Sequence, residues 1–442
     1  MDKRILVVGE VFVDVMLGVD GMDHLSRLGG VFHAARALCA LSLNYSIAFF
    51  APQYLISSVE SFSNRLNAFS CYCMGIINGS PNTMIDVSPT EAGDMGYVNP
   101  LCEQVDYSDE KINGLIQLIE RTNVTDVIYF PGRFDNKKVL RILNDSNVRI
   151  HIDLHYDYED VITESYNSLC SVFTSTSSAF FKNNCKGSFV DLKNICKSLG
   201  AKEFVLKENR GGSRYMSLVD EKTYMGKAFA VKTKHSVGVG DVFDSVFLAF
   251  SERDISFRLS ISSIISSSYA STLDYDFFTN EVKSILSNGE NLSLLRGNSI
   301  PWEEREKISI YIAAPDFPYV NKRPLNEVIE CLKYHNFRVR LPIQENGLIT
   351  ENSTVEERKM CYYNDLSIME ESKLLIAVVL NNDPGMYVEM GMFIAHGKPT
   401  ILYDPHYYCS NNFVVHAPDA VCRTLTDLID DTFRILGEKN ND

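Results

Sequence analysis

The stretch Val237-Gly238-Val239-Gly240-Asp241-Val242-Phe243 decides the fold of the first part of this chain, because it joins a glycine turn to an apolar helix. The glycines let the backbone approach a ligand closely, and a helix that starts here points its N–H groups and positive dipole end at that ligand. A phosphate fits such a place. Asp241 follows at once, where a carboxylate can take a proton from a hydroxyl that attacks the phosphate. An ordinary turn before a helix has the same pattern, so the surroundings must decide.

This stretch resembles the Gly-Ala-Gly-Asp signature of the ribokinase (PfkB) family of carbohydrate and nucleoside kinases. The resemblance implies that Gly238, Val239 and Gly240 form an anion hole for the transferred phosphoryl group. It also implies that Asp241 is the catalytic base and that ATP and Mg²⁺ are used. It covers residues 1–290 and implies an α/β fold, a three-layer αβα domain with a small β-sheet as a lid.

The first residues of the chain fit this expectation. Ile5-Leu6-Val7-Val8 predicts a buried strand, and the alternation in Val11-Phe12-Val13-Asp14-Val15-Met16 places Asp14 near the end of that first strand. Gly29 and Gly30 precede a helix predicted over residues 31–43. The resemblance implies that Asp14, Gly29 and Gly30 contact the hydroxyls of the acceptor. The alternative is that Asp14 caps a turn and the glycines only permit one.

Several positions depart from the family pattern. His33 stands where an Asn is usual, and it is either a substitute hydrogen-bonding group or a satisfied helix histidine. Ser175 and Ser178 replace the Asn-x-x-Glu that manages magnesium and phosphates, and neither supplies a negative charge. Glu208-Asn209-Arg210-Gly211-Gly212 matches the nucleotide turn only in its last glycine, so a hairpin turn is the alternative.

Alternating strands and helices are predicted along this half, with short lid strands at 83–87 and 95–98. Strands are expected at 46–50, 71–77, 127–130, 150–154 and 204–207, with helices at 59–68 and 109–121. Asp153 and His155 are interpreted as polar residues at a strand terminus, because two candidate ligands make weak evidence for a metal.

A second domain is predicted over residues 307–442, after a polar linker at 291–306 that contains Pro301. A fresh buried strand at 308–315 begins a new alternation of strands and helices, which predicts a flavodoxin/Rossmann-like αβα domain with its site at the carboxyl ends of the strands. Asp383-Pro384-Gly385-Met386-Tyr387-Val388-Glu389-Met390-Gly391 places two acids close to that edge. Such a pair suits glycosyl chemistry, and the alternative is a capping Asp with a solvated helix Glu.

This second pattern resembles the nucleoside 2-deoxyribosyltransferase family. The resemblance implies that Glu389 is the nucleophile of a glycosyl-enzyme intermediate, while Asp383 and Asp365 hold the sugar hydroxyls or assist protonation. It also implies a substrate-binding role for Tyr311, Pro315 and Gly385. Lys398-Pro399, after the helix that carries Glu389, is a further feature that matches the family pattern. Asn412, with Asn411 as its rival, is the expected contribution from a neighbouring subunit, so a homo-oligomer is expected.

The composition bounds the partners. A net charge of −15 argues against nucleic acid and anionic membranes, and no apolar run reaches about 18 residues. Eleven cysteines are scattered without zinc-site spacing, and no signal peptide is recognised, so a cytoplasmic protein with reduced thiols is expected. No metal-ligating residues are predicted.

Together these observations predict a two-site enzyme of nucleoside or sugar metabolism. The second domain would cleave or exchange an N-glycosidic bond without a cofactor, and the first would phosphorylate a hydroxyl. In the alternative, the first domain is a degenerate kinase that binds a nucleoside or nucleotide and regulates the second.

Overall fold

The structure is a computed structural model, and it describes residues 3–16, 25–78, 83–86, 97–98, 104–185, 188–288, 297–381 and 383–439. The described residues form two compact units, which divide between Ser299 and Ile300. This division lies within the segment 291–306 that was predicted as the linker, of which 291–296 fall outside the described residues. The two units are here called unit 1 and unit 2.

Unit 1 is built on a ten-stranded sheet in the order β14-β13-β12-β11-β10-β9-β1-β4-β5-β8. The strands from β12 to β5 run parallel, and the strands at both edges are antiparallel. Continuous apolar runs such as that of β1 are buried, as a parallel sheet covered on both faces requires. The strands are β1 (Arg4–Glu10), β4 (Asn44–Ala51), β5 (Ser70–Asn78), β8 (Gln104–Asp106), β9 (Asp126–Tyr129), β10 (Arg149–Asp153), β11 (Leu169–Ser175), β12 (Glu203–Lys207), β13 (Ser213–Ser217) and β14 (Thr223–Gly226).

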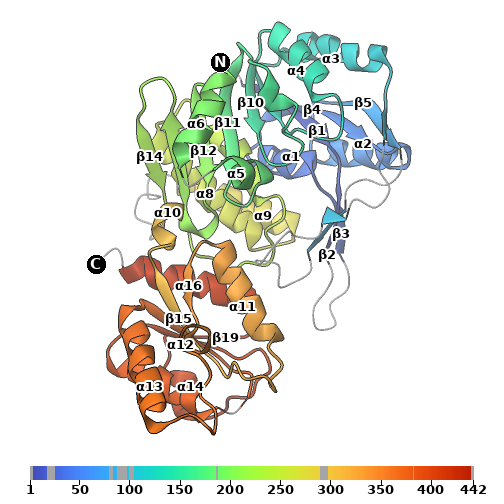
Figure 1. The fold of residues 1–442 in the computed structure, drawn as a ribbon. Coiled ribbons are helices and arrows are strands. Elements are labelled where there is room, and N and C mark those ends of the chain that lie inside the picture. The colour runs from blue at the N-terminus through green and yellow to red at the C-terminus, as the bar shows by residue number, and fades with distance from the viewer. Residues whose placement is uncertain are drawn as a thin grey trace. The chain divides into compact units, whose positions relative to one another are not determined.

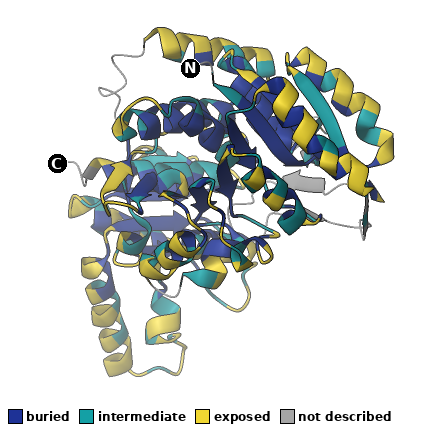
Figure 2. Cartoon of the chain, turned by 90° about the horizontal axis from the view of Figure 1, so that it is seen from above, coloured by how far each residue is buried: buried dark blue, intermediate teal, exposed yellow. Residues whose placement is uncertain are grey.

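Helices cover this sheet on both faces, which confirms the predicted α/β class with αβα layers (Figure 1). The inner strands of the sheet are buried, whereas the outer sides of the surrounding helices are exposed (Figure 2). Side-chain caps begin several of them, such as Ser108, which accepts from the backbone N–H of Lys111. The helices are α1 (Val31–Ala40), α2 (Ile56–Arg65), α3 (Asp109–Thr122), α4 (Asn136–Asp145), α5 (Ala179–Asn184), α6 (Phe189–Ser198), α7 (Val239–Ala249), α8 (Ile255–Ala270) and α9 (Tyr275–Ser287), with 3-10 turns η1 (Gln53–Leu55), η2 (Val161–Thr163) and η3 (Asn209–Gly211).

A separate four-stranded sheet in the order β3-β2-β6-β7 confirms that the lid region has its own small sheet. Its strands are β2 (Val13–Met16), β3 (Leu25–Leu28), β6 (Thr83–Asp86) and β7 (Tyr97–Val98), and the predicted turn between the last two lies outside the described residues. The prediction that Asp14 ends the first strand is wrong. β1 ends at Glu10, and Asp14 lies in β2, opposite Arg27 of β3. Its alternating pattern belongs to a strand of a different sheet.

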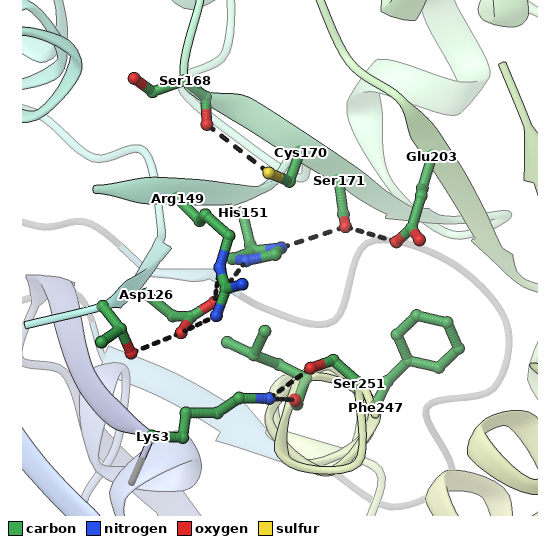
Figure 3. A network of polar contacts seen from close by, with 12 residues as sticks. Lys3, Asp126, Arg149, His151, Ser168, Cys170, Ser171, Glu203, Phe247 and Ser251 are labelled. Atoms are coloured by element: carbon green, nitrogen blue, oxygen red, sulfur yellow. Dashed lines mark hydrogen bonds and ion pairs between the residues drawn. The ribbon is translucent and has the colours of Figure 1, made fainter. Parts of the chain in front are cut away.

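A polar network ties the amino ends of four parallel strands together (Figure 3). Asp126 at the start of β9 receives hydrogen bonds from Arg149 at the start of β10, at 2.9 and 2.8 Å. His151 lies 3.3 Å from Asp126 and 3.0 Å from Ser171, whose hydroxyl donates to Glu203 at 2.8 Å. Burial opposes the ionisation of Asp126, but hydrogen bonds from His151 and Arg149 hold its pKa below the usual range.

Unit 2 contains a five-stranded parallel sheet in the order β16-β15-β17-β18-β19, as expected for a Rossmann-like domain. Ile310 and Ile312 of β15 face one buried cluster, and Tyr311 and Ala313 face another, so both faces of the sheet are covered. The strands are β15 (Ser309–Ala313), β16 (Arg338–Arg340), β17 (Leu374–Val378), β18 (Thr400–Tyr403) and β19 (Ala420–Cys422). The helices are α10 (Trp302–Arg305), α11 (Arg323–Tyr334), α12 (Pro342–Asn346), α13 (Val355–Glu371), α14 (Pro384–Ala395), α15 (Asn412–His416) and α16 (Leu425–Lys439).

Among the helices that the structure describes in either unit, none is long and apolar enough to cross a membrane.

Candidate functional sites

The glycine turn of unit 1 opens helix α7. Gly238 precedes the helix with a φ of 74°, a left-handed conformation that favours glycine. A Cβ at Gly238 would overlap the ring of His33, so the imidazole packs directly against this turn. Val239 and Gly240 form the first turn of the helix, where N–H groups have no acceptors within the helix. The turn therefore presents the anion-binding end of a helix.

Asp241 lies in the same first turn, and its side chain is half-buried. Burial first, then the charges of Asp153 and Asp14, raise the pKa of this carboxyl to about 7 against the opposing effect of Lys207. A carboxyl that titrates near neutral pH is suited to accept a proton from a hydroxyl.

A buried ion cluster beside this turn was not predicted from the sequence. The ammonium of Lys207, the last residue of β12, donates to Asp153 at 3.1 Å and to Asp244 at 2.6 Å. A Cβ at Gly240 would lie 3.2 Å from the Lys207 Nζ, so the ammonium reaches the glycine turn. The available signals were that Asp153 and Lys207 both end strands, and that Asp244 follows Asp241 by three residues on one helix.

The cluster holds two acids and one lysine, and their environments shift the pKa values of the two acids in opposite directions. Burial raises the pKa of Asp244 well above its ordinary value. Burial also opposes the ionisation of Asp153, but Lys207 and a hydrogen bond from Asp244 lower the pKa of Asp153. Burial likewise opposes the charge on Lys207, while Asp153 and Asp244 raise the pKa of Lys207. Burial thus favours the protonated form of Asp244, while Lys207 favours the ionised form of Asp153.

Asp14 lies in a second buried network, together with the glycines predicted for the acceptor. Its Oδ2 accepts from Arg27 Nε at 3.1 Å and lies 3.2 Å from His33 Nε2. Burial opposes its ionisation, but His33 and Arg27 lower the pKa of Asp14 to about 2. A Cβ at Gly29 would overlap the Asp14 carboxylate, and Gly30 has a φ of 60° before α1. Asp14 therefore holds side chains in place rather than capping a turn.

His33 and Arg27 connect this acceptor network to the glycine turn. His33 Nδ1 lies 2.8 Å from the hydroxyl of Tyr269 and its Nε2 lies 3.2 Å from Asp14, so both ring nitrogens have protein partners, as in the predicted alternative of a satisfied helix histidine. Arg27, which sequence inspection did not single out, also donates to the carbonyl of Val237 at 3.4 Å.

The residues at the predicted magnesium positions do not fit that ion. The hydroxyl of Ser178 accepts from the N–H of Phe181 at 2.9 Å and lies 2.7 Å from the hydroxyl of Thr174, so it serves as a helix cap. The hydroxyl of Ser175 lies 2.8 Å from that of Ser177. Magnesium is usually held through carboxylates, waters and substrate phosphates, whereas these positions offer two hydroxyls. The segment from Glu208 to Gly212 forms the β12–β13 hairpin turn.

The candidate site of unit 2 centres on Glu389, in the second turn of α14. Its Oε1 accepts from the hydroxyl of Tyr311 on the interior strand β15 at 3.1 Å. Burial first, then the charges of Asp365 and Asp383, raise the pKa of Glu389 to about 7 against the opposing effect of the Tyr311 hydrogen bond. The structure therefore brings these four residues, predicted from separate parts of the sequence, into one electrostatic cluster.

Asp365 has partners that the sequence did not indicate. Its Oδ1 accepts from the side-chain amide of Asn346 at 2.7 Å, and the thiol of Cys361 lies 3.6 Å from its Oδ2. Burial raises the pKa of Asp365, and both hydrogen bonds lower it. Asn346 ends α12 and Cys361 lies one helical turn before Asp365 on α13.

Asp383 caps helix α14 by accepting from the N–H groups of Gly385 at 3.1 Å and Met386 at 3.4 Å. This matches the structural alternative for Asp383, although its charge still acts on Glu389. Gly385 is exposed in the first turn of α14, and Pro315 is buried in the loop after β15.

Asn412 begins α15 and is exposed, while its rival Asn411 caps that helix by accepting from Phe413 N–H at 2.9 Å. The preceding loop is fastened by Asp404, whose carboxylate accepts from the N–H groups of Tyr408 and Cys409, each at 2.9 Å. Within the described residues, no hydrogen bond joins Asn412 to Glu389.

Residues 310–419 match the nucleoside 2-deoxyribosyltransferase family model. The match confirms the predicted resemblance of the second domain, and it spans about a quarter of the 442 residues. Every residue predicted for this nucleoside 2-deoxyribosyltransferase-like site lies inside it. No curated protein matches the chain.

Among solved structures, the chain is similar to phosphofructokinase-2 from Escherichia coli. The tetrameric inhibited form of that enzyme is 12% identical with a TM-score of 0.49, and the match covers 65% of this chain and 100% of that chain. Its complex with substrates and products is 14% identical, with the same TM-score of 0.49 and the same coverage of 65% and 100%.

Proposed function

We propose that unit 2 cleaves the N-glycosidic bond of a nucleoside or 2′-deoxynucleoside, with Glu389 as the nucleophile. The observation that carries this proposal is the environment of Glu389. Tyr311 fixes its carboxylate by a hydrogen bond, and burial together with the charges of Asp365 and Asp383 raises its pKa. The nucleoside 2-deoxyribosyltransferase match over the same residues supports it.

The chemistry runs in two displacements. A carboxylate oxygen of Glu389 attacks C1′ and forms an ester bond, while the bond from C1′ to the base nitrogen breaks. The base leaves with the bonding electrons and takes up a proton, in which Asp365 or Asp383 assists. Water or the nitrogen of another base then attacks C1′, and Glu389 departs as a carboxylate. Tyr311 donates to one oxygen of Glu389 and so orients the other toward the sugar.

The test is base release from nucleosides, 2′-deoxynucleosides and their monophosphates in the absence of ATP. Glu389→Gln is expected to abolish release, because an amide is a poor nucleophile. The matched control is Glu356→Gln, which changes an exposed glutamate on α13 and is expected to leave release unchanged. Release by Glu389→Gln at the wild-type rate would show that Glu389 is not the nucleophile.

For unit 1 we propose ATP-dependent phosphorylation of a sugar or nucleoside hydroxyl, with Asp241 as the base. The pKa of Asp241 near 7 and its place in the first turn of α7 support this role. Asp241→Asn is expected to abolish ATP consumption and to leave base release intact. Because both units are joined in one chain, we also infer that the product of one unit is a substrate of the other.

The alternative is that unit 1 binds a nucleoside or nucleotide and regulates unit 2. The serines at 175 and 178, which replace the family's Asn and Glu, favour this alternative. It predicts that no acceptor stimulates ATP consumption, whereas an added nucleotide changes the rate of base release.

A further inference from the structure

The geometry points to a phosphate site at the glycine turn of unit 1 in which the ammonium of Lys207 takes the place of a divalent metal ion. The ligand class is a phosphate monoester or the terminal phosphate of a nucleotide. This inference rests on the proposed function of unit 1, since it concerns the site of Asp241.

Lys207 is placed to contact a ligand at the turn. Its side chain is 9% exposed, and its Nζ would lie 3.2 Å from a Cβ at Gly240, in the first turn of α7. The ammonium has three donors, of which Asp153 and Asp244 occupy two. Among the described residues the third donor has no hydrogen-bond partner. An ammonium and the positive end of a helix therefore converge on one place.

Around the turn, the residues that the structure describes offer no group of side chains that could hold a metal ion. Ser178 is committed to the cap of α5, and Ser175 to Ser177. The two buried carboxyls nearest in the cluster, Asp153 and Asp244, are bound to the ammonium. A divalent cation entering here would meet the positive charge of Lys207 at close range.

The two acids of the cluster do not prevent the ammonium from attracting an anion. Each has one buried oxygen that accepts no hydrogen bond, Asp153 Oδ1 and Asp244 Oδ1. A proton on Asp244, whose pKa burial raises, removes one of the negative charges. Lys207 then balances Asp153, and the helix end is free to hold the phosphate. A phosphate with its double charge suits an ammonium and backbone N–H groups.

The test measures binding of inorganic phosphate and ADP to the full chain by calorimetry, once in EDTA and once in magnesium chloride. The wild type is expected to bind with dissociation constants that agree within about twofold in the two buffers, which is under 0.5 kcal/mol. Lys207→Met combined with Asp153→Asn keeps the net charge of the cluster and avoids an unpaired buried acid. This variant is expected to bind about tenfold or more weakly. Lys202→Met, an exposed lysine just before β12, is the matched control.

Binding that requires magnesium would overturn the inference, and so would a double variant that binds in EDTA as tightly as the wild type while it remains folded by circular dichroism. The proposed kinase activity fails separately. If phosphate binds in EDTA through Lys207 but no acceptor stimulates ATP consumption, the inferred phosphate site is supported and the proposed kinase activity is contradicted. If neither ligand binds in either buffer, both proposals fall.

Discussion

Glu389 has to satisfy two opposing demands, because its carboxylate must ionise to attack a sugar and yet it lies half-buried beside two other acids. Burial, Asp365 and Asp383 together favour the protonated form, which places the pKa near 7 against an ordinary value of 4.5. Ionisation at neutral pH therefore costs folding free energy. The same cost leaves a reactive carboxylate that a substrate with developing positive charge at C1′ can stabilise.

This cost predicts that Glu389→Gln stabilises the protein at high pH. A carboxyl whose pKa is raised on folding contributes stability below its unfolded pKa and loses it as pH rises through the folded pKa. The gain from the amide should therefore be small at pH 5 and reach about 1–3 kcal/mol at pH 8. Thermal unfolding across this range measures it, with Glu356→Gln as the control that shows no such trend. A gain that is equal at pH 5 and pH 8 would contradict the raised pKa.

At the residue scale, the sequence predicted the acids that accompany a local signature and missed those that do not. Asp241 follows its glycines directly and Glu389 follows Asp383 by six residues, so both stand in short recognisable patterns. Lys207 is separated in the sequence from Asp153 by 54 positions and from Asp244 by 37. The packing of helix α7 on strands β10 and β12 brings these three together, and no local spacing encodes that arrangement.

At the element scale, the buried strands were the most predictable part, because continuous apolar runs mark parallel strands covered on both faces. Thr354 and Glu357 form a capping box at the start of α13, a pattern of residue types that is local in the sequence. The prediction for Asp14 failed because the sequence shows that 11–16 alternates but does not show which sheet the strand joins. β2 pairs with β3 and β6, away from β1.

The polar network at the amino ends of β9 to β12 is expected to stabilise unit 1. Asp126→Asn removes the charge that holds Arg149 and His151, and it should lower the free energy of unfolding by about 2–4 kcal/mol at pH 7. Since folding depresses the pKa of Asp126, its contribution is full above the unfolded pKa near 4 and declines progressively as pH falls from there toward the lower folded pKa.

Urea unfolding at pH 7 and at pH 3.5 measures the contribution of Asp126. Asp220→Asn is the matched control, because Asp220 forms an exposed ion pair with Lys222 at 2.8 Å that water already screens. An Asp126→Asn variant no less stable than Asp220→Asn at pH 7 would show that the network contributes no net stability.

At the scale of the whole molecule, several large apolar side chains of unit 2 remain exposed. Phe413 next to Asn412 is 85% exposed, and Tyr407 in the preceding loop is 72% exposed. Helix α13 also exposes Val355, Met360, Tyr362 and Tyr363. Where such side chains lie together, they mark a surface that another protein covers. If the covering partner is a second copy of this chain, the exposed Phe413 beside Asn412 would fit the prediction that Asn412 enters the site of a neighbouring subunit.

If Asn412 completes the site of a neighbour, two inactive variants should restore each other. Asn412→Ala keeps Glu389 but offers no amide, and Glu389→Gln keeps the amide but has no nucleophile. In mixed dimers, one of the two sites combines an intact Glu389 with an intact Asn412. Co-expression of the two variants should therefore recover about a quarter of the wild-type rate of base release, if subunits pair at random. Co-expression of Glu389→Gln with an Asn412→Ala, Glu389→Gln double variant is the control and should stay inactive. An Asn412→Ala protein that is fully active alone, or a mixture that stays inactive although it forms dimers, would show that each chain builds its site without Asn412 from another.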